Sequence, residues 1–223
     1  MWKPIDESQH AVEGELAARK SVIRHCILMN ENQINQGTSG NISIRHRDGL
    51  LISPTSIPYV DLEPEDIVFI NGAGESQGHH EPSSEWRFHY DILMNRPDVN
   101  VVLHAHPTYC TILAILGKKI PPLHYMIFVS GGNDIRCSPY ALYGTKELSD
   151  YAVTALRDRK ACLLGHHGMI SVGMTLKQTL WRAIEVETLA RQYHGCLQLG
   201  KEPPLLNEEQ VEEVLKKTGT YGL

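Results

Sequence analysis

The sequence predicts a single α/β domain, spanning residues 1–223, with a mixed, mostly antiparallel central β-sheet and helices on both faces. Three observations predict this fold. Helical and strand-like patterns alternate along the chain. Several strands are joined by turns that are too short for a parallel crossover, which needs about a dozen residues or more. The 223 residues show no internal repeat, low-complexity tract or shift in composition that would mark a second domain.

The first third of the chain predicts one long helix followed by short strands. Apolar residues recur at helical spacing from about Ser8 to Gln36, and Gly37 ends the pattern. Short β-type runs between turn signals then predict three strands, Asn41–Arg45, Gly49–Ser53 and Ile67–Ile70. The first two flank the turn signal Arg47-Asp48-Gly49 and are expected to form a hairpin.

The remaining helices are predicted from side chains that can cap a first turn. These capping residues are Ser83, Thr145, Thr175 with Gln178, and Asn207 with Gln210. The first three of these helices are expected to end near positions 95, 157 and 199. Apolar runs predict buried strands over Val101–Ala105 and Ala161–Gly165, and the first is followed by a helix from about Pro107.

Charge and cysteine usage limit the partners and the compartment. The net charge is −5 with histidine neutral, and no long basic run occurs, so neither nucleic acid nor an anionic membrane is expected as a partner. Any bound phosphate should belong to a small molecule. Residues 1–10 lack the pattern of a secretory signal, and no apolar run approaches the roughly 18 residues of a membrane span. Five cysteines without a Cys-x-x-Cys pair are typical of reduced thiols, which favours a cytoplasmic protein.

Two histidine clusters predict a metal site. His104 and His106 lie at the end of a predicted strand, where residues i and i+2 point to the same side. A Gly-His-His-Gly run after another strand offers a third imidazole, from either His166 or His167, and its glycines allow a close approach. Three imidazoles with an open fourth position are typical of catalytic zinc. Spacing leaves His124 undecided, and the remaining histidines, His89 among them, are interpreted as lying outside this site.

Three loops without lysine have the composition of a small phosphate site. They are Gly37–Asn41, Ser53–Ser56 and Pro82–Glu85. The last one opens a predicted helix, whose positive N-terminal end favours an anion. Glu85 has two interpretations that the local sequence leaves open. It is either an acid that complements this helix dipole or a group that moves protons in catalysis.

Taken together, these motifs resemble those of the class II aldolase and adducin family. The segments that carry the resemblance are Asn35–Ser43, Pro54–Tyr59, Pro82–Arg87, His104–His106 and His166–Gly168. The similarity extends over nearly the whole chain and is strongest to the branch that acts on L-fuculose phosphate. The resemblance implies a homotetramer with active sites at subunit interfaces.

The resemblance also implies a role for each candidate site residue. The ligands of one Zn2+ per chain would be His104, His106 and His167, although another divalent metal would also suit such a site. The phosphate would be held by Asn41, Thr55, Ser83 and Ser84, with Gly40 and Ser56 at its edge.

Three further residues are assigned to catalysis or substrate binding by the same resemblance. Glu85 would be the catalytic acid/base, a role for which we expect a raised pKa, and Tyr125 would enter the site of a neighbouring subunit. Tyr221 would lie near the substrate. Tyr143 stands where the fuculose branch has a phenylalanine of the aldehyde pocket, which leaves the aldehyde open.

The expected activity is a metal-dependent aldolase that cleaves a ketose 1-phosphate into dihydroxyacetone phosphate and an aldehyde. L-fuculose 1-phosphate and ketose 1-phosphates of the 5-deoxyribulose or 5-methylthioribulose type are the expected substrates. The alternatives are an L-ribulose 5-phosphate 4-epimerase-like enzyme, a methylthioribulose 1-phosphate dehydratase and a non-catalytic binding module of the adducin-head type.

Overall fold

The structure is a computed structural model that describes residues 14–217. Its centre is an eight-stranded sheet with the order β4-β3-β2-β1-β5-β8-β7-β6. The strands are β1 (Asn41–His46), β2 (Gly49–Ile52), β3 (Val68–Ile70), β4 (Ser76–Gln77), β5 (Val101–Ala105), β6 (Arg136–Ser138), β7 (Ala161–Leu164) and β8 (Gly168–Gly173). Neighbouring strands are antiparallel except β6 and β7, which are parallel. The predicted mixed, mostly antiparallel sheet is therefore confirmed.

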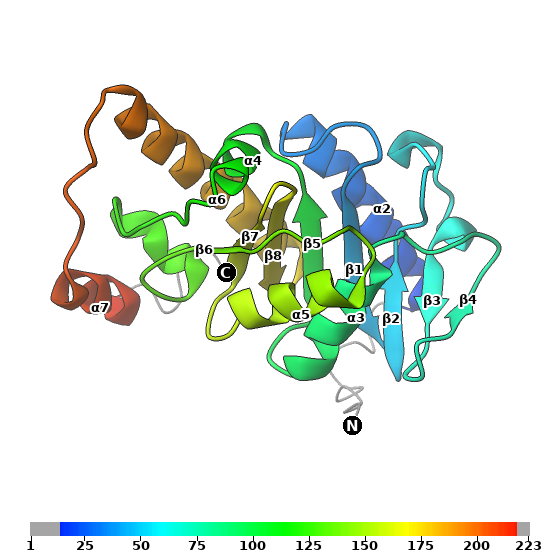
Figure 1. The fold of residues 1–223 in the computed structure, drawn as a ribbon. Helices are drawn as coiled ribbons and strands as arrows, with labels where there is room; N and C mark the ends of the chain where they lie inside the picture. Colours follow the sequence, from blue (N-terminus) through cyan, green and yellow to red (C-terminus); the bar gives the residue numbers. More distant parts are fainter. Residues whose placement is uncertain (1–13, 218–223) are drawn as a thin grey trace.

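Helices cover both faces of the sheet (Figure 1). One face carries α3 (Trp86–Asn95) and α5 (Lys146–Ala155), and the other carries α2 (Glu15–Glu31), α4 (Thr108–Ile115) and α6 (Leu176–Gln198). The helix α7 (Glu208–Lys217) packs on the 3-10 helix η3 (Tyr125–Ser130), and two shorter 3-10 helices are η1 (Tyr59–Asp61) and η2 (Pro64–Asp66). No helix within residues 14–217 combines the length and apolar character that a membrane crossing requires.

Each helical layer encloses its own hydrophobic core. Val102 and Leu103 are neighbours on β5, yet Val102 belongs to the core beneath α3 and α5 and Leu103 to the core beneath α2 and α6. Successive side chains of a strand point to opposite faces, so this interior strand has to be apolar on both sides. This explains why the strand appears in the sequence as a continuous apolar run.

Most of the predicted helix starts are confirmed. The Thr145 hydroxyl accepts from the Leu148 N–H at 3.2 Å. Asn207 and Gln210 form a reciprocal pair in which each backbone N–H donates to the other side chain at 2.9 Å. These contacts are local, so sequence spacing alone was sufficient to predict them.

Two predicted element boundaries were wrong. Ser83 is not the N-cap of α3, because Glu85 occupies that position and α3 begins at Trp86. Ser83 instead precedes a turn at 84–85, where its Oγ accepts from the Glu85 N–H at 3.3 Å. The first helix ends at Glu31 rather than near Gln36, and its expected start near Ser8 lies outside the described residues.

Candidate metal centre and active site

Four side chains meet at one end of the central sheet, and we call them the His/Glu cluster. They are Glu85, His104, His106 and His167, and one ligand atom from each lies within 4.8 Å of the others. Glu85 immediately precedes α3, His104 lies in β5, His106 just follows β5, and His167 just precedes β8. A group of this composition could bind a metal ion.

The strand register explains why these distant positions converge. Asn41 at the start of β1 lies opposite His104, and Ala105 at the end of β5 lies opposite Met169 near the start of β8. The beginnings of β1 and β8 therefore flank the end of β5. Three adjacent strands of the sheet thus present their terminal residues to one place.

The turn between β7 and β8 directs His167, rather than His166, into the cluster. His166 adopts a left-handed backbone conformation with φ of 55° and is exposed, and its ring lies edge-on to Tyr140. His167 Nε2 lies 3.2 Å from Glu85 Oε1. A Cβ at position 168 would lie 2.6 Å from His106 Cδ2, so Gly168 makes room for that imidazole.

The imidazoles are oriented with their Nε2 atoms toward one another. The Met169 carbonyl can only accept a hydrogen bond, so the contact of 2.9 Å from His104 Nδ1 requires an N–H there. The other ring nitrogen, Nε2, therefore faces the cluster, where His106 Nε2 lies 2.8 Å away. Burial, reinforced by His104, lowers the pKa of His106 to about 3, which keeps this imidazole neutral.

Glu85 is the anionic member of the cluster. Its side chain makes no hydrogen bond to the first turn of α3, although the residue occupies the N-cap position. Oε2 lies 3.1 Å from His104 Nε2 and accepts a hydrogen bond of 3.0 Å from Asn41 Nδ2. Oε1 is buried and has no hydrogen-bond partner within the described chain. Three imidazole nitrogens and a carboxylate with one orphaned oxygen together fit a divalent cation.

Opposing effects act on the pKa of Glu85. Burial raises it, but His104 and His167, whose Nε2 atoms approach the carboxylate, lower it more strongly, so that the net shift is downward. This direction is opposite to the raised pKa that we expected from sequence. Glu85 is consequently an ionised carboxylate in this arrangement.

His89 lies directly behind the cluster, although it was interpreted as lying outside the site. It is fully buried, with Nε2 2.5 Å from Asn41 Oδ1 and Nδ1 2.8 Å from Ser43 Oγ. Burial, with a contribution from His104, lowers the pKa of His89 to about 3, so the ring is neutral. The spacing of four residues from Glu85 to His89, which places two residues on one helix face, could have indicated this proximity.

The three loops expected to bind phosphate lie side by side. Pro54 pairs with Pro82, and Ser53 Oγ accepts from the Ile42 N–H at 3.3 Å, one residue beyond Asn41. Ser83 is buried beside this pairing. The side chains of Thr55, Ser56 and Ser84 are exposed.

Gly40 is held in a position that excludes a side chain. A Cβ there would lie 2.7 Å from the His104 carbonyl oxygen and equally close to Asn35 Oδ1. This tight fit fixes the first loop against the strand that carries His104. Asn41 differs from expectation in one respect, because its amide already contacts Glu85 and His89.

The three candidate tyrosines are placed differently. Tyr125 is half exposed at the start of η3, and its ring lies beside His124. Tyr143 is exposed next to Gly144, where a Cβ would lie 2.8 Å from the Ser84 carbonyl oxygen. Tyr143 is thus close along the chain to one of the loops. Tyr221 lies outside the described residues.

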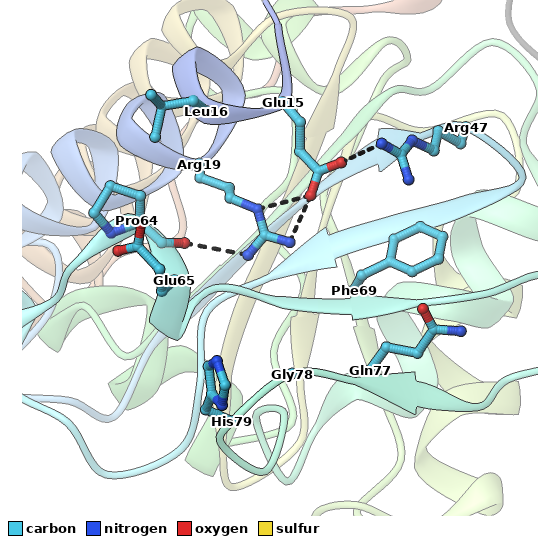
Figure 2. A pocket seen from close by; sticks show the side chains of 10 residues that line it. All are labelled: Glu15, Leu16, Arg19, Arg47, Pro64, Glu65, Phe69, Gln77, Gly78 and His79. Atoms are coloured by element: carbon cyan, nitrogen blue, oxygen red, sulfur yellow. Dashed lines mark hydrogen bonds and ion pairs between the residues drawn. The ribbon is translucent and has the colours of Figure 1, made fainter.

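A separate pocket lies between α2, η2 and the β3–β4 edge, and three of its charged groups, Glu15, Arg19 and Arg47, are paired with each other (Figure 2). Arg19 and Arg47 contact Glu15 at 2.7 and 2.6 Å, and Arg19 also donates to the carbonyls of Pro64 and Ile67. None of the predicted site residues lines this pocket. The His/Glu cluster therefore remains the candidate site.

Comparison with known proteins agrees with this geometry. Residues 20–194 match the model of the class II aldolase and adducin N-terminal domain. The chain belongs to this family.

The named relatives specify the kind of member. The chain is 54% identical over 189 residues to a 5-methylthioribulose-1-phosphate/5-deoxyribulose-1-phosphate aldolase of Rhodospirillum rubrum, with 85% of each chain covered. It is 48% identical over 204 residues to the L-fuculose phosphate aldolase of Escherichia coli, covering 92% of this chain and 95% of that one. A solved L-fuculose 1-phosphate aldolase superposes with a TM-score of 0.87 at 34% identity, covering 90% and 95% of the two chains. The chain is a class II aldolase.

Proposed function

We propose that this aldolase uses one Zn2+ per chain to cleave a ketose 1-phosphate into dihydroxyacetone phosphate and an aldehyde. The observation that carries the proposal is the buried Glu85 carboxylate, which lies within 3.2 Å of both His104 Nε2 and His167 Nε2. This arrangement places a carboxylate that can transfer protons next to a set of metal ligands. Both are needed to cleave a carbon–carbon bond next to a carbonyl.

The proposed metal ligands are His104, His106 and His167. Three imidazoles with an open position are typical of catalytic zinc, although imidazole sites also accept other divalent ions. When bound, the cation would supply Lewis-acid stabilisation of the negative charge that develops on the substrate oxygens. The hydrogen bond from His104 Nδ1 to the Met169 carbonyl would hold this ligand in its tautomer and orientation.

Two proton movements balance the cleavage. The C4 hydroxyl loses its proton as the C4 carbonyl forms, and the electrons of the C3–C4 bond move into an enediolate. Protonation at C3 then yields dihydroxyacetone phosphate. We assign the proton at C3 to Glu85, and the proton exchanged at the aldehyde oxygen to Tyr125 of a neighbouring subunit.

The phosphate is proposed to lie on the three adjoining loops. Asn41, Thr55, Ser83 and Ser84 would hold it, with Gly40 and Ser56 at its edge, and the exposed hydroxyls of Thr55 and Ser84 support this assignment. The site would neutralise the phosphate with N–H groups and hydroxyls instead of lysine. Such neutral donors suit a small, diffusible sugar phosphate.

The assembly is proposed to be a homotetramer with active sites at its interfaces. Tyr125 supports this arrangement, because it is 50% exposed while its neighbour Met126 is buried. An exposed tyrosine outside its own chain's cluster is free to reach the cluster of another chain. All five cysteines are free, which supports the proposed cytoplasmic location.

The aldehyde half of the substrate is proposed to be a small deoxy fragment. The relatives named above act on 5-deoxyribulose, 5-methylthioribulose and L-fuculose phosphates. Tyr143, exposed beside the loop of Ser84, and Tyr221 are the side chains that we assign to the aldehyde end.

A panel assay on ketose 1-phosphates tests the proposal. The zinc-loaded protein should release dihydroxyacetone phosphate from the 5-deoxyribulose, 5-methylthioribulose or L-fuculose derivative, with L-rhamnulose and L-ribulose derivatives as comparisons. Chelation should abolish this release, and zinc should restore it. Full activity in verified metal-free protein, or conversion to one unsaturated product in place of two fragments, would contradict it.

A further inference from the structure

A chain of buried hydrogen bonds leads from β1 through α3 to the candidate acid/base. Ser43 Oγ lies 2.8 Å from His89 Nδ1, His89 Nε2 lies 2.5 Å from Asn41 Oδ1, and Asn41 Nδ2 lies 3.0 Å from Glu85 Oε2. All four residues are at least 95% buried. Water is therefore not available to replace a lost partner in this chain.

The Asn41 amide fixes the direction of every bond in the chain. Its Nδ2 can only donate, so Glu85 Oε2 accepts from it. The amide oxygen then faces His89 and needs an N–H from Nε2. A neutral imidazole with a proton on Nε2 has a bare Nδ1, which accepts the Ser43 hydroxyl proton.

The His89 ring is also held mechanically. It stacks on Phe88 with ring centroids 4.7 Å apart, and Phe88 lies edge-on to His104 at 5.4 Å. Without the donor at position 89, the Asn41 amide oxygen would lose its hydrogen bond in a dry site. The amide could then shift toward another donor and hold Glu85 Oε2 less firmly.

We propose that His89 is a positioning residue that, through the amide of Asn41, holds Glu85 by Oε2 and leaves Oε1 free to carry the proton at C3. The contrast between the two oxygens supports this role, because Oε2 accepts a hydrogen bond from Asn41, whereas Oε1 has no hydrogen-bond partner in the described chain and lies 3.2 Å from His167 Nε2. The role rests on the proposed aldolase function. It assigns to His89 an orienting task and no contact with substrate.

The first experiment determines the protonation of His89 in the hydrogen-bond chain and needs no substrate. Nitrogen-15 NMR of the zinc-loaded wild-type protein should show His89 neutral, with the proton on Nε2 and none on Nδ1. A proton on Nδ1, or a charged ring, would reverse at least one bond of the chain and overturn the proposal. His89→Gln identifies the His89 signal by its loss.

The second experiment isolates the proton step in the same zinc-loaded protein. Exchange of a C3 hydrogen of dihydroxyacetone phosphate with deuterated solvent requires Glu85 but no aldehyde. His89→Phe, which keeps a ring but has no donor, should slow exchange by about 10- to 100-fold with little change in KM or zinc content. His89→Gln keeps an N–H near the position of Nε2 and should retain most of the rate.

A matched control separates positioning from folding. Ile92 is equally buried on α3 but has no polar contact, so Ile92→Ala should lower Tm while leaving the exchange rate of the folded protein unchanged. A wild-type rate in His89→Phe, equal losses in His89→Phe and His89→Gln, or loss of zinc from His89→Phe would each overturn the positioning role. A wild-type protein that neither exchanges nor cleaves would refute the proposed function instead, and the NMR result would still decide the hydrogen-bond chain.

Discussion

Replacing Glu85 with glutamine separates its two interpretations by magnitude. The amide keeps the shape of the side chain and an acceptor for Asn41 Nδ2, but it cannot take up or release a proton. General acid–base catalysis contributes about 100- to 10,000-fold, which corresponds to about 3 to 5 kcal/mol of barrier. We expect kcat to fall within this range, and KM to change little because the proposed phosphate loops stay intact.

The alternative role predicts a much smaller and different effect. An acid that only complements the dipole of α3 stabilises the fold by about 0.3 to 1 kcal/mol and leaves kcat unchanged. The structure favours the larger effect, since Glu85 is 5% exposed and makes no capping hydrogen bond. Its carboxylate faces two imidazoles instead.

The assay is steady-state release of dihydroxyacetone phosphate at matched metal content. Glu81→Gln is the control, because Glu81 is an exposed acid on the same loop and outside the His/Glu cluster. It should behave like wild type. A kcat for Glu85→Gln less than about tenfold below wild type, with full metal occupancy, would refute the reasoning.

Three further predictions follow from the same geometry. His167→Ala should weaken metal binding by more than the roughly 10- to 100-fold typical of an outer partner, whereas His166→Ala should not, and equal metal content in the two variants would contradict this. Gly40→Ala should lower the free energy of unfolding by about 1 to 3 kcal/mol in urea titrations, because its Cβ would lie 2.7 Å from a backbone carbonyl oxygen, and an unchanged midpoint would show that the loop yields freely. Tyr125→Phe and Glu85→Gln chains should each be nearly inactive, but refolding them together should restore activity through sites shared between subunits. No recovery in confirmed mixed oligomers would place Tyr125 outside a shared site.

Sequence patterns predicted those parts of the fold that depend on neighbours in the chain. Thr145 caps its helix as expected, because the contact spans three residues. Strand β8 was missed, since Ser171 and the glycines at both ends interrupt the apolar run by which the equally buried strand β5 was predicted. The helix start expected at Ser83 falls later, at Trp86. The Ser83 N–H donates to the carbonyl of Ser53, thirty positions away in the chain, and local spacing cannot predict this contact.

The candidate site shows the same division between local and long-range information. His104 and His106 were predicted from their spacing, but only the family resemblance favoured His167 over its neighbour. The structure places His167 beside Glu85, and its metal role remains a prediction. His89 was interpreted as lying outside the site, because the local sequence does not indicate which strand residue a histidine within a helix will contact. Its link to Ser43 depends on how α3 lies over β1.

The position of the cluster within the strand order has a consequence for how this site can change. β1, β5 and β8 are interior strands, and each has neighbours on both sides. Insertions at the outer strand β6, or in the turn between β3 and β4, can lengthen loops or add contacts for other substrates without shifting the reactive groups. A one-residue shift in the register of any of the three interior strands would instead point the site residues of that strand to the opposite face of the sheet. We therefore expect sequence variation in this enzyme to accumulate at the edges of the sheet. The reactive groups depend on the register of three strands, so grafting a single loop onto another scaffold would not reproduce the site.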